Sequence, residues 1–332
     1  MRKPPVRGAP AGWPRMQQHR RPPSHGEQGT DCPFYQAAWQ QFLYAMRPDG
    51  SGQPRFLSSY LTLAELFPSG AVSTRMFARR NMAVARAQTS VNVLAAQPSH
   101  GALMLAPRSL QHPNDTADPG DNHAIDDGVR QAVTDGLLID QRGNPIYYAI
   151  HVNPAFAAFV RSNQLNTLAA IGANATLNFA SGMVELKSAW QIVDANHAPA
   201  GYFVTKAKVP RLVAKNNADV VPDGTLRDVT VALIAIHVAF TLDGHPEMIW
   251  STFDHLGHDC HGNTAQDNAP SLSALPDNVP DNTPVSTCSW NLYKANTAKG
   301  NANNSPGASQ LVASFEEASQ TFTKGGHRCR RQ

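Results

Sequence analysis

The chain has 332 residues, enough for one large domain or two ordinary ones. Hydrophobic residues make up 42% and charged residues only 16%, with a formal net charge of +3. This composition argues against a helical protein with charged surfaces and favours a β-rich protein with long polar loops. No segment reaches the eighteen or so apolar residues of a membrane span. No basic run carries stacking aromatic residues, so nucleic-acid binding is not indicated.

The N-terminal half begins with a basic segment and continues with helical signals. Residues 1–31 contain almost no aliphatic side chain, so we expect them to be disordered. Pro33 to Met46 places apolar residues on one helical face, which predicts an amphipathic helix. A second helix is expected at Asp126 to Thr134.

Strands dominate the middle of the chain. Leu137 to Asp140 and Ile146 to Val152 flank a glycine-containing turn, which predicts a hairpin. A short helix follows from Asn153 to Phe159, and further strands are expected at Met183 to Val193 and Tyr202 to Val209.

These elements predict an α+β fold, mainly an antiparallel and sandwich-like sheet with peripheral helices and long polar loops. Residues 32–262 would form one domain, 263–309 a long polar loop, and 310–332 a C-terminal helix and basic tail.

Five of the thirteen histidines lie between His237 and His261, in a predicted hairpin and the loop that follows it. Val229 to Leu242 reads as a buried strand, and Asp243-Gly244 suits a two-residue turn. That turn would place His237 opposite Trp250 on one face of the sheet, beside small alanines that leave room for a ligand. The alternative is a buried neutral imidazole with a local hydrogen-bond partner.

Glu185 and Lys187 alternate with apolar residues along another strand, so they share one face. On a solvent-facing surface this pair would matter little. If this face lines a ligand site instead, the pair would place a carboxylate and an amine on a rigid strand, which suits acid–base chemistry.

The loop after the hairpin contains further metal-ligand types. His255, His258 and His261 could bind zinc, copper or iron together with His237, or they could be incidental histidines of a polar loop. Gly257 to His261 resembles a haem-attachment sequence that lacks its first cysteine, which argues against covalent c-type haem. Cys260 and Cys288 flank the polar loop, and either form a disulfide in an oxidising compartment or remain free thiols.

Several segments resemble a poorly characterised family of bacterial proteins. The segments are Gly182 to Trp190, with Glu185, Lys187 and Trp190, and the His237 strand leading into Pro246 to His255. The family carries G-S-x-E-x-K-A-A-W and a histidine strand running into P-x-W-I-W-x-T-F-E-H. Its members are largely exported, and some accompany c-type cytochromes.

The resemblance and the residues together predict a periplasmic or secreted protein, although no signal peptide is recognisable in the sequence. The first functional hypothesis is a metal-assisted enzyme acting on a small molecule, with Glu185, Lys187 and His237 in catalysis. Trp190 and Trp250 would bind the ligand. The second is a non-catalytic ligand-binding or redox-partner protein that presents the hairpin and polar loop to an electron-transfer partner.

Overall fold

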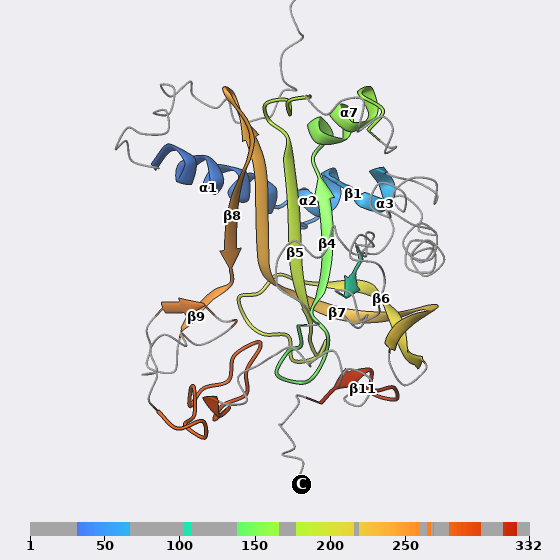
Figure 1. Ribbon diagram of the computed structural model, residues 1–332, viewed down its shortest axis with the longest axis vertical. Helices are drawn as coiled ribbons and strands as arrows, with labels where there is room; N and C mark the ends of the chain where they lie inside the picture. The colour runs from blue at the N-terminus through green and yellow to red at the C-terminus, as the bar shows by residue number, and fades with distance from the viewer. Residues whose placement is uncertain are drawn as a thin grey trace, which may run out of the picture.

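A computed structural model describes residues 32–66, 103–107, 138–165, 177–215, 219–258, 264–266, 268, 279–299 and 315–323. The predicted disorder of residues 1–31 and the predicted helix at Asp126 to Thr134 lie outside these ranges. Within them, the molecule is built around one curled sheet of eight strands. Figure 1 shows helix α1 (Cys32–Met46) crossing this sheet beside strand β8 (His245–Asp254).

The strand order in the large sheet is β1-β4-β5-β7-β6-β2, with β3 paired to β4 and β8 paired to β7. Every described pair is antiparallel except β2 with β6. The other strands, in sequence order, are β1 (Leu61–Thr62), β2 (Leu103–Met104), β3 (Ala106–Pro107), β4 (Tyr147–Val152), β5 (Val184–Ile192), β6 (Val204–Lys215), β7 (Asp219–Leu242), β9 (Leu256–His258), β10 (Thr264–Gln266), β11 (Phe315–Glu316) and β12 (Thr321–Phe322). The remaining helices are α2 (Arg55–Ser59), α3 (Leu63–Leu66) and α7 (Pro154–Ser162). The mainly antiparallel α+β prediction is confirmed at this level.

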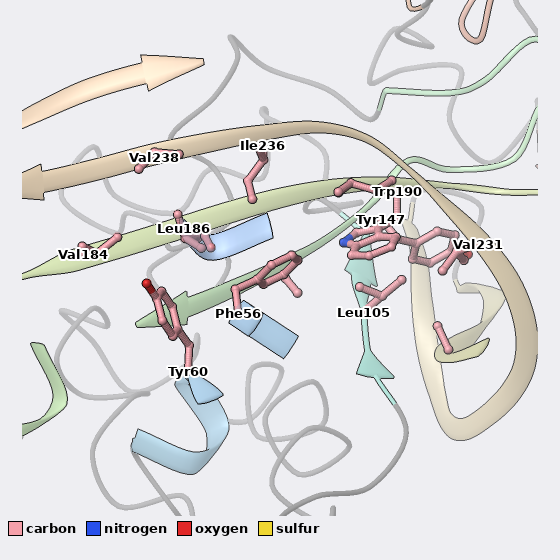
Figure 2. Packing of buried hydrophobic residues seen from close by; sticks show 14 of the residues in the cluster. Phe56, Tyr60, Leu105, Tyr147, Val184, Leu186, Trp190, Val231, Ile236 and Val238 are labelled. Carbon is pink, nitrogen blue, oxygen red and sulfur yellow. The ribbon is translucent and has the colours of Figure 1, made fainter. Parts of the chain in front are cut away.

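One face of the sheet carries the main hydrophobic core. Figure 2 shows Phe56 and Tyr60 near Leu186, with Tyr147 and Trp190 next to each other farther along the sheet. Helix α1 contributes its inner side to the same cluster through Ala37, Ala38 and Ala45. The helix predicted at Pro33 to Met46 is therefore confirmed, and its buried stripe covers this face.

The predicted hairpin forms, but its register differs from the expected one. Leu242 pairs with His245 across the Asp243-Gly244 turn, as predicted. A bulge then interrupts the ladder, because Phe240 pairs with Ile249. The bulge contains Pro246, which has no backbone N–H to donate to a ladder. His237 consequently faces Thr252 rather than Trp250.

A second irregularity lies on the other side of β7. Ala189 pairs with Ala235, whereas the next residue of β5, Trp190, pairs with Leu233. Ile234 is therefore an extra residue on β7. Before Ile234 the odd-numbered residues of β7 point into the core, and after it the even-numbered residues do.

Two other expectations need correction or qualification. Phe315 to Phe322 forms a two-stranded hairpin rather than the predicted C-terminal helix. The side chain of its turn residue Gln320 forms two hydrogen bonds with the backbone of Leu212. The Leu212 N–H donates to Gln320 Oε1 at 2.7 Å, and Gln320 Nε2 donates to the Leu212 carbonyl at 2.8 Å. Contacts with a distant strand thus override the local helical pattern. In the described part, the other two sheets have two strands each, so no second large sheet completes a sandwich there.

Candidate functional site

The sheet face opposite the core carries an ordered array of polar side chains. Cross-strand pairing defines three rows over β4, β5, β7 and β8, and directly paired residues point to the same face. The rows are Val152–Glu185–Ala239–Trp250, Ile150–Lys187–His237–Thr252 and Tyr148–Ala189–Ala235–Asp254. Because paired positions lie about 5 Å apart, Glu185, Lys187 and His237 are neighbours.

The middle row holds the groups best suited to chemistry. Lys187 is only 4% exposed, and its Nζ lies 5.4 Å from the centre of the Tyr148 ring. His237 Nδ1 and Thr252 Oγ1 are 2.7 Å apart. When Nδ1 carries the proton and donates it to Thr252, the lone pair lies on Nε2. The amine and the imidazole are thus held by two adjacent strands.

The environment shifts three pKa values toward the neutral forms of the side chains. Burial raises the pKa of Glu185, and the nearby charge of Lys187 opposes that rise. Burial, and then the charge of Lys187, lower the pKa of His237, whereas Asp254 raises it. Burial also raises the pKa of Asp254, against the opposing effects of His237 and a hydrogen bond from Asn268. Partly desolvated acids and bases in one cluster are typical of sites for proton transfer.

Part of the polar loop docks beside this array and joins it through hydrogen bonds. Asn268 Nδ2 donates to Asp254 Oδ1 at 3.3 Å and to the Ile234 carbonyl at 3.1 Å. Asn291 Nδ2 donates to Asn268 Oδ1 at 3.0 Å, and Asn291 Oδ1 accepts from Gln191 Nε2 at 2.9 Å. The loop therefore fixes the Asp254 carboxylate, which lies in the row next to His237 and interacts with it electrostatically.

Sequence reasoning assigned no role to Asn268 or Asn291. The signal that could have found Asn291 is the Trp290-Asn291-Leu292-Tyr293 segment, an apolar island in an otherwise polar stretch. Such an island has a reason to pack against a core, and Trp290, Asn291 and Tyr293 are indeed buried.

The two tryptophans assigned to ligand binding lie on opposite faces. Trp250 is 53% exposed and shares a row with Glu185, so its place fits contact with a ligand. Trp190 is fully buried in the core cluster, where its Nε1 donates to Ser188 Oγ at 2.8 Å. Trp190 is therefore a core residue, because its alternation with Leu186 carries it to the covered face.

His255 belongs to the rim of the network rather than to the row of His237. Its ring stacks on Tyr202 at 3.6 Å between centroids, and Nε2 lies 3.1 Å from the Gly201 carbonyl. Among the described residues, no group of three or more His, Cys, Asp or Glu side chains is placed to hold a metal ion. The side chain of His258 and the whole of His261 lie outside those residues.

The cysteines are in different states. Cys32 is a free, exposed thiol at the start of α1. Cys288 is disulfide-bonded and lies just before the docked island. Its partner lies outside the described residues, so pairing with Cys260 stays a prediction.

Comparison with known proteins returns no relative. The chain matches no protein-family model, no curated protein and no solved structure. The resemblance to an exported bacterial family therefore stays an expectation. No helix in the described part of the chain is long and apolar enough to cross a membrane.

One further histidine is buried on the core side of the sheet. His151 is 2% exposed, and its Nδ1 has no hydrogen-bond partner among the described residues. The edge of its ring faces Phe56, with 5.2 Å between centroids. Burial lowers the pKa of His151 to about 4, against a smaller opposing effect of Glu65. His151 is paired through the backbone with Leu186, so it belongs to the packing rather than to the polar rows.

Proposed function

We propose that this chain is an extracytoplasmic enzyme that carries out proton transfer on a small polar substrate at the polar sheet face. One observation carries the proposal: Lys187 and His237 are direct cross-strand neighbours, with Glu185 and Asp254 on the same face. A purely structural sheet gains little from this arrangement, because partial burial of four titratable groups is unfavourable.

The chemistry of the groups suggests their roles. Neutral His237 can accept a proton through Nε2 while Thr252 orients the ring. The Glu185 carboxyl, with its raised pKa, can return a proton to a leaving group. The Lys187 ammonium can stabilise negative charge that develops on an oxygen of the substrate. Together they support hydrolytic or isomerising reactions.

The proposal also concerns the cellular compartment of the protein and the binding of a metal ion. The disulfide at Cys288 favours a periplasmic or secreted location, since disulfides persist in oxidising compartments. The described side chains do not supply a ligand set for zinc, copper or iron. The proton-transfer roles above use the protein's own acids and bases, and a zinc, copper or iron ion bound by His237, His255, His258 and His261 stays a separate proposal.

A second candidate function is ligand binding without turnover. The observation that favours it is the exposed indole of Trp250 at the end of the Glu185 row. An exposed aromatic ring beside polar groups is a common feature of binding sites. In this case the acids and bases would select the ligand rather than transform it.

The test compares wild type with His237→Gln on a panel of 4-nitrophenyl esters, glycosides and phosphates and of 4-nitroanilides. If His237 is the base, the substitution lowers kcat/KM about 100-fold or more. The control is His197→Gln, because the His197 side chain is 83% exposed in a turn away from the rows. Equal rates for wild type and His237→Gln would refute the proposal that the chain is an enzyme with His237 as its base. Binding to wild type without turnover would support the second candidate.

A further inference from the structure

Helix α1 presents large apolar side chains to solvent. Tyr35 is 65% exposed, Trp39 is 54% exposed and Leu43 is 61% exposed. Their spacing of four residues places them in one stripe on the helix, about 12 Å long. We call these three residues the outer stripe.

The outer stripe lies on a helix that has no charge at all. Cys32–Met46 contains no Asp, Glu, Lys or Arg, and the exposed polar side chains between the stripe residues are Gln36 and Gln40. Surface helices normally carry charged residues on the face away from the core. An exposed face that is both apolar and uncharged marks an interaction surface.

The position of α1 leaves this face accessible. Its inner side is buried through Ala38 and Ala45, and the Trp39 ring meets Phe253 of β8 at 4.9 Å between centroids. In Figure 1 the N-terminal part of α1 extends beyond β8, at the edge of the sheet. The helix has 15 residues, fewer than the roughly 20 that a membrane span needs, so it can lie on a bilayer but cannot cross one.

The sequence next to the outer stripe identifies the surface that it fits. Residues 1–22 precede α1 and carry six basic side chains and no acidic one: Arg2, Lys3, Arg7, Arg15, Arg20 and Arg21. We propose that the outer stripe docks on the surface of a bilayer containing anionic lipid. This inference does not depend on the proposed enzyme.

Each component has the chemistry of the membrane interface. Tyr and Trp prefer the headgroup level, where their rings are half in an apolar environment and their polar atoms are hydrated. Leu43 adds buried apolar area, and basic residues are attracted to anionic headgroups. A second copy of the chain fits less well, because pairing through this face would add a second basic segment with no acid on α1 to offset it.

The experiment is co-sedimentation of the full chain with two kinds of vesicle. One contains phosphatidylcholine alone, and the other contains one third phosphatidylglycerol. We expect selective binding to the anionic vesicles, which weakens strongly as salt rises from about 0.1 to about 0.5 M. The double variant Tyr35→Gln/Leu43→Gln should bind the anionic vesicles at least about tenfold more weakly than wild type, because two apolar contacts with the bilayer are lost.

A matched control separates the outer stripe from exposed aromatic residues in general. Trp250 is 53% exposed, nearly the same as Trp39, but belongs to the polar sheet face. Trp250→Gln should leave vesicle binding unchanged. Circular dichroism and the unfolding temperature of each variant verify that it is folded.

Three results would overturn the proposal. They are equal binding to both kinds of vesicle, unchanged binding of the double variant, and a wild-type dimer that the double variant dissociates while neither protein binds vesicles. The last result would assign the outer stripe to a protein interface.

Discussion

The buried imidazole of His151 should make the protein sensitive to mild acid. The ring is buried on the core face and its pKa is lowered to about 4, compared with 6.5 for an ordinary histidine. Between these two pH values the unfolded chain binds a proton that the folded chain does not. The free energy of unfolding therefore falls as pH falls below 6.5.

The size of this effect follows from the two pKa values. From about pH 7 to about pH 5, the linkage relation gives a loss of roughly 2 kcal/mol for this one group. His151→Leu removes the titrating ring and keeps an apolar side chain of similar size. It also removes the unpaired Nδ1, so at neutral pH the variant should be at least as stable as wild type.

Urea unfolding of both proteins at several pH values between 5 and 7 measures the difference directly. Groups shared by the two proteins, including Glu185 and Asp254, cancel in the comparison. The stability of the variant relative to wild type should rise by roughly 2 kcal/mol across that interval. His197→Gln provides the control, since it removes an exposed imidazole rather than a buried one. Parallel stability curves for wild type and His151→Leu would show that the ring is not desolvated as described.

Three more predictions concern positions outside the polar rows. Asn153→Ala should destabilise the fold by about 1–3 kcal/mol in urea unfolding, because the buried amide caps α7 and also binds the start of β5. Gly143→Ala should lower stability by more, or prevent soluble expression, since φ is +87° and a Cβ would collide with the Phe322 carbonyl. A peptide joining Cys260 to Cys288 should appear in the non-reducing mass spectrum of native protein, and two free thiols there would contradict both the bond and export.

The sequence predicted features that depend on local pattern. The Asp243-Gly244 turn, the Gly143 turn and α1 follow from residue types and periodicity, and the structure contains all three. The shared face of Glu185 and Lys187 followed from strand alternation alone. These features need no knowledge of distant contacts.

Features set by long-range contacts were missed or wrong. The bulge that contains Pro246 shifts the partner of His237 to Thr252, and no local rule fixes its extent. The hydrogen bond from Asn291 to Asn268 joins two parts of a loop whose sequence carries no periodic signal. The C-terminal hairpin depends on Leu212, about a hundred residues away in the chain.

The extra residue Ile234 sets the phase of the whole polar face. Upstream of it, odd-numbered residues of β7 such as Val231 point into the core; downstream, even-numbered residues such as Ile236 do so. Deleting this single residue while the upstream pairing holds would reverse the alternation beyond it. His237 would then enter the apolar core, and Ile236 and Val238 would take its place beside Lys187. The existence of the site thus depends on one residue whose side chain takes no part in its chemistry.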